Sequence, residues 1–334
     1  MDAIVEYYYN SWIEFLAYEP SKDSVFRGQS NKQLKGNEKN KEGIERWCLI
    51  SSYHRDRRPY NFLTSGFHES DSIKKFSYLY KVEPFKSLLK EENKLSVIDF
   101  LQVLQHYGFK TPLIDFTRDK LTALYFAAID LSAHMVSHDV YRNEQYFSVF
   151  ELNAHLLQKH FNIIDTSKSL LANKWEVLED QRFYRELINS KESDQPFVYT
   201  VLNPNYIINR NAKKQSGVFI LFDSTEDFYA DTNLGFDGWL TSQTHDRGII
   251  LDEPILKVHN ICHDSIIVDK PPNCTNMFAY LMSKNRIGFN LFAEDDLQGL
   301  KLDYNNELAI RTLKCVNNKS NCDCIKSLSL LGIS

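Results

Sequence analysis

The chain of 334 residues is poor in glycine, with 12 in all, and it lacks the motifs that build the commonest nucleotide and hydrolase sites. It contains no GxxxxGKS/T, GxGxxG, HExxH, GxSxG or CxxC pattern. These absences exclude glycine-rich phosphate loops, the helical zinc-protease site and the nucleophile elbow. If the protein is catalytic, its chemistry must come from scattered polar residues at the ends of strands.

Long hydrophobic runs are also absent. The longest, residues 123–129, ends at Asp130, whereas a helix that crosses a membrane needs about 20 apolar residues. The first nine residues lack the positive segment and apolar core of a secretory signal. We therefore expect no membrane partner and a cytoplasmic location.

Cysteine is scarce, with six residues, and its spacing does not match a structural zinc site. Cys315, Cys322 and Cys324 lie near the C-terminus, with Cys262 and His263 far upstream, whereas structural zinc usually takes two closely spaced pairs. We expect reduced cysteines and no metal.

The composition is otherwise that of a folded protein, with 43% hydrophobic and 25% charged residues. The net charge of -5 excludes a protein whose whole surface binds nucleic acid, and it leaves a local basic groove open.

The periodicity of apolar residues predicts an α+β fold with a mixed central sheet and flanking helices. The uniformly apolar segment 218–222 is expected at the centre of the sheet, and Ser96 with Asp99 is expected to cap a helix that ends near Gly108. We divide the chain into an N-terminal helix (1–20), a main domain (21–304) and a polar tail (305–334). Strands are predicted over 24–30, 111–117, 147–152, 197–202, 218–222 and 265–268. Helices are predicted over 1–19, 66–92, 97–107, 174–189 and 277–286, with another after Thr117 that Thr117 or Asp119 can cap.

Arg27 lies on the first predicted strand between Phe26 and Gly28, with Gln29 following. A guanidinium matches a phosphate or carboxylate, and the glycine removes a side chain that would hinder a close approach. The alternative is a structural pair between Arg27 and an acid such as Asp115.

His106 and Asp115 are the next candidates. The end of a helix favours the cationic form of His106, and an unpaired carboxylate on the strand that contains Asp115 is costly to bury. A polar site and a purely structural network are both open.

The basic segment that leads from Arg210 into the strand 218–222 is the third candidate. Lys213, Lys214 and Gln215 precede Gly217, so the segment could bind a polyanion or could be a solvated loop.

These segments resemble the FRG domain family, which is named for a Phe-Arg-Gly motif such as residues 26–28. The similarity continues through QHYG (105–108), LIDFT (113–117), ALYFA (123–127), RNAKKQSGVF (210–219) and LFAEDDLQG (291–299). It covers residues 20–300, so the main domain is identified as an FRG domain.

The order of these motifs is also similar to that of ADP-ribosyltransferases, including the DNA-modifying toxins, and it implies an ADP-ribosyltransferase-like fold. The resemblance implies that Arg27, with Gly28 and Gln29, holds the phosphates of NAD and that Thr117 shapes the nicotinamide pocket. Gln215 falls where the toxins have a glutamate. The resemblance therefore implies either that another acid, such as Asp115 or Glu179, replaces that glutamate, or that the protein binds without transferring ADP-ribose.

We accordingly expect an intracellular effector, a toxin or anti-phage defence protein, that uses NAD and a nucleic-acid or protein acceptor. An antitoxin or regulatory partner is a further expectation. His106 and Tyr107 would line the pocket, Asp115 would orient Arg27 or a substrate hydroxyl, and Gln215 would lie over the acceptor. The alternatives are a metal-independent nuclease, with His106 as acid or base, and a non-catalytic nucleotide- or nucleic-acid-binding module.

Overall fold

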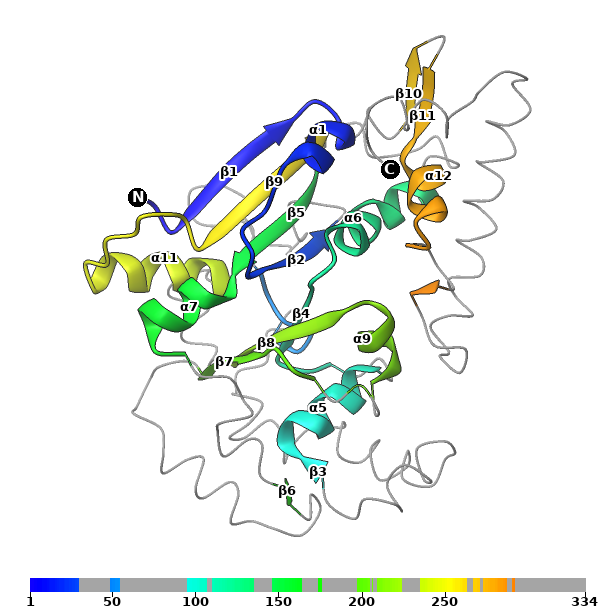
Figure 1. Cartoon of the computed structure of the whole chain (residues 1–334). Coiled ribbons are helices and arrows are strands. Elements are labelled where there is room, and N and C mark those ends of the chain that lie inside the picture. The colour runs from blue at the N-terminus through cyan, green and yellow to red at the C-terminus, as the bar shows by residue number, and fades with distance from the viewer. Residues whose placement is uncertain are drawn as a thin grey trace.

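A seven-stranded mixed sheet forms the centre of the protein (Figure 1). The computed structural model describes residues 1–29, 49–54, 95–106, 110–134, 146–163, 174–175, 197–204, 206, 209–223, 235–262, 267–270, 273–286 and 290–291. The strand order is β1 (Ile4–Tyr9), β9 (Leu256–Cys262), β5 (Tyr146–Asn153), β2 (Ser24–Gln29), β4 (Leu113–Thr117), β8 (Gly217–Asp223) and β7 (Phe197–Val201). The pair β1 and β9 is parallel and every other neighbouring pair is antiparallel.

Two further pairs of short strands lie apart from the central sheet. They are β10 (Ile267–Lys270) with β11 (Asn273–Asn276), and β3 (Leu95–Ser96) with β6 (Lys174–Trp175). The helices are α1 (Trp12–Ala17), α5 (Val97–His106), α6 (Lys120–His134), α7 (Ala154–Phe161), α9 (Arg210–Lys214), α11 (Phe236–Asp246) and α12 (Met277–Ser283). The predicted α+β class with a mixed sheet and flanking helices is confirmed. Of the helices described, none is long and apolar enough to cross a membrane.

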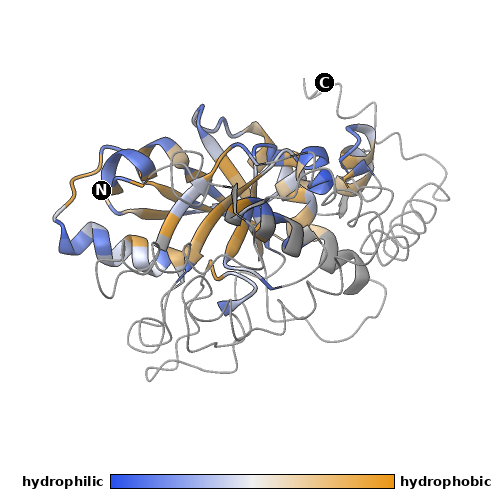
Figure 2. Cartoon of the chain, turned by 90° about the horizontal axis from the view of Figure 1, so that it is seen from below, coloured by the Kyte–Doolittle hydropathy of each residue, from blue (hydrophilic) through white to orange (hydrophobic). Residues whose placement is uncertain are grey.

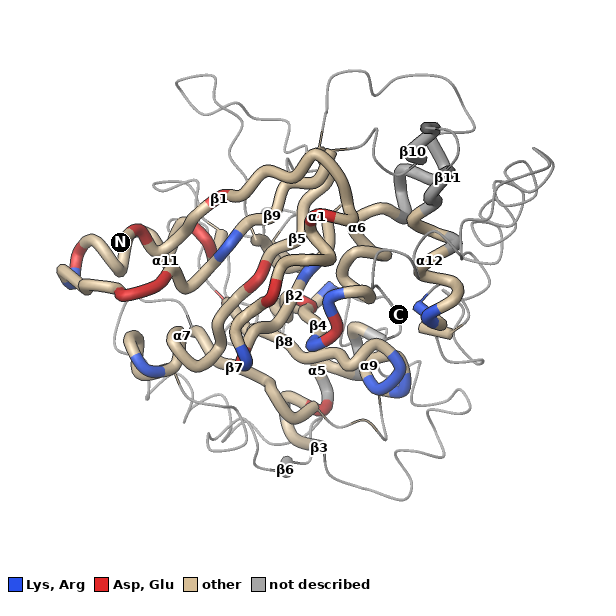
Figure 3. The backbone as a smooth tube through the Cα atoms, turned by 45° about the horizontal axis from the view of Figure 1, so that its top comes forward, with Lys and Arg blue, Asp and Glu red and all other residues tan. Residues whose placement is uncertain are grey.

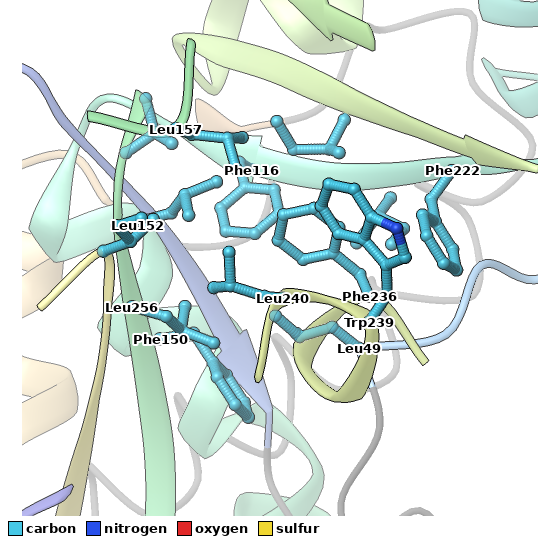
Figure 4. Packing of buried hydrophobic residues seen from close by; sticks show 14 of the residues in the cluster. Leu49, Phe116, Phe150, Leu152, Leu157, Phe222, Phe236, Trp239, Leu240 and Leu256 are labelled. Atoms are coloured by element: carbon cyan, nitrogen blue, oxygen red, sulfur yellow. The ribbon is translucent and has the colours of Figure 1, made fainter. Parts of the chain in front are cut away.

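One hydrophobic core packs α7 and α11 against a face of the sheet (Figure 4). Phe236 and Trp239 of α11 stack with ring centroids 5.7 Å apart, and both meet Phe222 of β8. Burying side chains of this size removes them from water at a gain of roughly 1.5–3 kcal/mol each. The strands are accordingly the hydrophobic part of Figure 2, and hydrophilic segments gather at its periphery.

A second core packs α1, α6 and α12 against strands of the same sheet. Phe26 of β2 and Phe147 and Val149 of β5 contribute to it, whereas Val25 and Phe150 belong to the first core. Neighbouring residues of one strand point to opposite faces, so both faces of the sheet are covered. The central sheet is therefore the middle layer of three.

Two helix starts follow the sequence pattern closely. Ser96 Oγ accepts a hydrogen bond of 3.0 Å from the Asp99 backbone N–H, as the predicted cap of α5 requires. Asp119 caps α6, since its carboxylate accepts bonds from the Leu121 backbone N–H at 3.1 Å and from the Thr122 hydroxyl at 2.6 Å.

The prediction of one helix over residues 1–19 is wrong for its first half. Ile4–Tyr9 is strand β1, and only Trp12–Ala17 is helical. The apolar residues fit a helical stripe, but the run IVEYYY is rich in β-forming residues, and β9 offers it a parallel partner. Ser11 separates the two elements, because its side chain caps α1 by accepting from the Glu14 backbone N–H.

The expectation that segment 218–222 forms the centre of the sheet is also wrong. Strand β8 is second from one edge, and β2 is the central strand. Every residue of β8 is nevertheless buried. Because both faces of the sheet are covered, a strand near the edge is as apolar as a central one. The helix predicted over 174–189 is wrong at its start, because Lys174–Trp175 pairs with β3 as strand β6. The rest of that helix, the predicted helix over 66–92, Glu179 and the tail over 305–334 lie outside the described residues.

Candidate functional site

Strands β2 and β4 are neighbours in the sheet but pair at a single position, Phe26 with Thr117. β2 continues beyond Phe26 on the ladder of β5 alone, which pairs with every residue from Ser24 to Gln29. In Figure 1, β1, β9 and β5 run in a different direction from β8 and β7, and β2 and β4 lie where the two groups meet. The sheet therefore separates immediately after Phe26.

Arg27 lies at this point of separation. Its Nη1 donates a hydrogen bond of 2.8 Å to the backbone oxygen of Asp115, and its Nε donates one of 3.3 Å to Oε1 of Gln29. The side chain is 13% exposed. The guanidinium thus satisfies a strand carbonyl that β2 does not reach, and part of it faces solvent.

The carboxylate of Asp115 lies beside the guanidinium, with Oδ2 at 3.8 Å from Nη1 of Arg27. The side chain is 60% exposed, and Nε2 of Gln105, in the last turn of α5, donates to its other oxygen. Thr111 in turn donates to Oε1 of Gln105 at 2.7 Å. Arg27 and Asp115 therefore lie side by side, as predicted. The amide of Gln105 holds the exposed carboxylate of Asp115 in place.

Gln215, at the end of α9, contacts the last residue of β4. Thr117 Oγ1 donates a bond of 2.5 Å to the backbone oxygen of Gln215 and accepts one of 2.9 Å from the Asp119 backbone N–H. Nε2 of Gln215 donates to the backbone oxygen of Leu291 at 3.1 Å. Asp115 and Thr117 are two residues apart on one strand and so share a face. Arg27, Asp115, Thr117 and Gln215 thus lie around β4.

The amide of Gln29 is a buried polar group of this site whose donor is unsatisfied. Gln29 is 8% exposed, and among the described residues its Nε2 has no hydrogen-bond partner. An unsatisfied buried donor costs about 1–3 kcal/mol, so an acceptor at this place would stabilise the protein.

Gly28 has a role that the sequence did not indicate. A Cβ at this position would lie 1.9 Å from the backbone oxygen of Ala123 and 2.4 Å from the nitrogen of Ala127, both in α6. The glycine therefore lets α6 pack directly on β2. Its contact is with the helix on one face of the sheet, while Arg27 next to it points to the other side of the strand.

His106 is the last residue of α5, directly after Gln105. The side chain of Gln105 reaches Asp115, while the side chain of His106 and the whole of Tyr107 lie outside the described part of the structure. Their roles in the site stay predictions.

A buried acid–histidine pair, which the sequence analysis missed, lies on neighbouring strands of the same sheet. His259 Nε2 is 2.8 Å from Oε2 of Glu151, and Ser24 donates to Oε1 of Glu151 at 2.6 Å. A carboxylate only accepts, so His259 Nε2 carries the proton; Nδ1 of the neutral ring then accepts from the Tyr9 hydroxyl at 3.0 Å. Lys257 lies 3.4 Å from Oε1 of Glu151.

Burial opposes ionisation of Glu151, but the hydrogen bonds from His259 and Ser24 and the charge of Lys257 outweigh it and lower the pKa of Glu151 to about 2. Burial lowers the pKa of His259 below its ordinary value, although Glu151 acts in the opposite sense. We assign an ionised glutamate and a neutral histidine. The pair joins β2, β5, β9 and β1, and both side chains are almost fully buried, so it is a structural network.

A second buried set consists of Ser51, His54 and Asp223. His54 Nδ1 is 2.8 Å from the Ser51 hydroxyl, and its Nε2 is 3.2 Å from Oδ1 of Asp223. The residue types are those of a hydrolase triad, but the side chains of His54 and Asp223 are wholly buried. The Ser51 hydroxyl also accepts from the His54 backbone N–H, so the serine closes a local turn. Among the residues that the structure describes, no group of three or more histidines, cysteines and acids could hold a metal ion.

Comparison with known proteins decides the family of residues 22–135. The family model of the FRG domain matches residues 22–135. The chain contains an FRG domain. The matched segment runs from the start of β2 through α6, so it includes Arg27, Gln105, Asp115 and Thr117, while Gln215 follows it. No curated protein and no solved structure matches the chain.

Proposed function

We propose that this FRG-domain protein binds NAD where β2 and β4 separate and transfers ADP-ribose from it, as an ADP-ribosyltransferase-like effector. The observation that carries the proposal is the position of Arg27: its guanidinium lies across the separation, anchored by the Asp115 backbone oxygen and Gln29, and is partly exposed. A planar guanidinium held in this way is suited to the phosphates of a dinucleotide. The orphan donor of Gln29 beside it would gain an acceptor from the same ligand.

Asp115 supplies the carboxylate that the chemistry needs. In the transfer, the bond between nicotinamide and C1′ of the ribose breaks and nicotinamide takes both electrons. A lone pair of the acceptor then forms the new bond to C1′, and the acceptor's proton passes to solvent. Positive charge develops on the ribose, and Asp115 is the exposed acid beside Arg27 that can stabilise it.

NAD binding and nicotinamide release test this proposal with two variants and a control. Arg27→Lys keeps the charge but loses the fork, so the affinity for NAD measured by calorimetry should fall at least about tenfold. Asp115→Asn keeps the backbone oxygen that Arg27 binds, so the fold and NAD binding should persist while nicotinamide release falls by about 10² to 10³. Arg247→Lys, at an exposed position after α11, is the matched control and should change neither quantity.

A toxin or defence role also predicts an effect on bacterial growth. Expression of the wild-type protein should slow bacterial growth, and Asp115→Asn should relieve the effect at equal protein level. Absence of NAD binding by the folded wild-type protein, shown by circular dichroism to be intact, would overturn the proposal.

A non-catalytic nucleotide-binding module is the second candidate, and Gln215 favours it. Its side chain is an amide, and Nε2 is used in a bond to the backbone of Leu291 rather than facing a substrate. This candidate predicts that NAD binding depends on Arg27 and that the protein releases no nicotinamide from NAD, whether or not cell lysate is added. Release that depends on Asp115 would rule it out.

A further inference from the structure

Basic side chains from three elements gather near the turn between β4 and α6. They come from the turn itself, from α9, and from the end of α12 with the residues that follow it, and Figure 3 shows these blue segments near one another. We call them the basic surface: Arg118, Arg210, Lys213, Lys214, Lys284 and Arg286. The first four are exposed, and the last two are partly exposed.

Specific contacts hold the three elements together. The Arg118 backbone N–H donates a bond of 3.0 Å to the Ser216 oxygen, just after α9, and its guanidinium donates to the Leu202 oxygen. Arg286, after α12, pairs with Asp119 in the turn. Because these contacts join α9 and the end of α12 to Arg118 and Asp119 in the turn, the basic surface is one continuous feature of the fold.

The charge of this surface opposes that of the whole chain, which is -5. The acid that the described residues place within it is Asp119, which is 19% exposed and paired with Arg286. Exposed acids lie elsewhere, for example Glu6, Asp252 and Glu253, and Figure 3 shows the red segments toward β1 and α11. Such a separation attracts a polyanion to one side of the molecule.

We propose that the basic surface binds the sugar–phosphate backbone of a nucleic acid. Cations spread over three elements can neutralise several phosphates at once, which a single small anion does not require. Arg118 of the basic surface directly follows Thr117, which lies two residues after Asp115 in the chain and contacts Gln215. Nucleic acid bound there would lie next to the proposed NAD site. Its role as the acceptor of ADP-ribose rests on the proposed function, whereas the binding of nucleic acid does not.

Fluorescence anisotropy with the full chain and labelled 20-nucleotide single-stranded DNA, single-stranded RNA and duplex DNA tests the binding, in the absence of NAD. The decisive variant is Lys213→Gln/Lys214→Gln in the last turn of α9. The matched control is Lys22→Gln/Lys159→Gln, which removes the same charge at exposed positions outside the surface, with Lys159 also in the last turn of a helix.

We expect at least one of the three probes to bind with an affinity that falls steeply with salt. If that probe is single-stranded, the Lys213 and Lys214 variant should weaken binding by roughly 20-fold at 0.1 M salt and should reduce the slope of log affinity against log salt by about 1.4, at about 0.7 per phosphate contact. The control should retain both quantities. Arg27→Lys should leave this binding unchanged, so failure of the NAD proposal and failure of this one are distinguishable.

Three results would overturn the proposal: no salt-dependent binding of any of the three probes, equal weakening by the two double variants, or displacement of the probe by polyglutamate at equal charge concentration. The last result would assign the surface to acidic proteins.

Discussion

Gly28 and Ala123 are in such close contact that a Cβ on the glycine would lie 1.9 Å from the alanine's backbone oxygen. The contact joins the central strand β2 to α6, so packing explains the glycine of the Phe-Arg-Gly motif. Helix α6 cannot shift freely, because Ala123, Leu124 and Ala127 are buried in the second core.

Substitution of this glycine should therefore be severe. Gly28→Ala places a methyl group against helix backbone rather than a flexible side chain, and we expect the free energy of unfolding to fall by more than about 3 kcal/mol in urea denaturation. Gly248→Ala is the control: its φ of +60 strains an alanine, but nothing lies within 4 Å, so the cost should be about 1 kcal/mol. Similar losses for the two variants would contradict this account of Gly28.

The local signals in the sequence predicted much of this fold. The alternation and apolar runs of residues 147–152 and 218–222 gave strands close to β5 and β8, and the Ser96 and Asp119 caps were legible because a cap is a contact between residues two or three apart. No local signal explains the proximity of Arg27 to Asp115, because they are 88 residues apart and approach each other only through the neighbouring positions of β2 and β4.

Long-range pairing was beyond these signals. The helical stripe of Ile4 and Tyr8 and the strand propensity of the same segment compete, and the parallel partner that decides between them, β9, is about 250 residues away. Glu151 and His259 were missed for the same reason: one is the single acid of β5 and the other the single histidine of β9, and only the register of the two strands brings them together. An acid within the apolar run YFSVFELN was the signal that could have found the pair.

Lys120 links the N-terminal segment to the FRG domain. Its Nζ donates to the backbone oxygens of Leu16 at 2.9 Å and Tyr18 at 2.7 Å, at the end of α1, and burial lowers its pKa. Bonds from a charged donor contribute about 1.5–3 kcal/mol, so Lys120→Met should lower the free energy of unfolding by that amount.

The loss should be local first. Hydrogen exchange followed by mass spectrometry should show faster exchange in α1 and β1 of the Lys120→Met variant than in β5 or β8. Lys22→Met, at an exposed position, should match the wild type. Uniformly faster exchange throughout the sheet would show that Lys120 supports the whole core and not the N-terminal segment.

The Glu151–His259 pair should make stability depend on pH in a defined window. The pKa of Glu151 falls from 4.5 in the unfolded chain to about 2 in the fold, so its contribution is present above about pH 4.5 and is lost as pH falls toward 2. His259 has the same sign, because its lowered pKa means that the fold disfavours protonation below 6.5. By linkage, Glu151 alone should account for a loss of about 1.4 kcal/mol between pH 7 and pH 3.5.

Glu151→Gln removes the negative charge of this network and nearly preserves the shape of the side chain. Removing one partner of a buried pair costs about 3–5 kcal/mol, so the variant should be less stable than the wild type by that amount at pH 7. It should also lose less stability than the wild type between pH 7 and pH 3.5, because its side chain does not titrate. Urea denaturation at both pH values measures the two effects, with Glu253→Gln, an exposed acid, as the control. If the pH dependence of Glu151→Gln equals that of the wild type, folding does not lower the pKa of Glu151, and the account of an ionised glutamate stabilised by His259 and Ser24 fails.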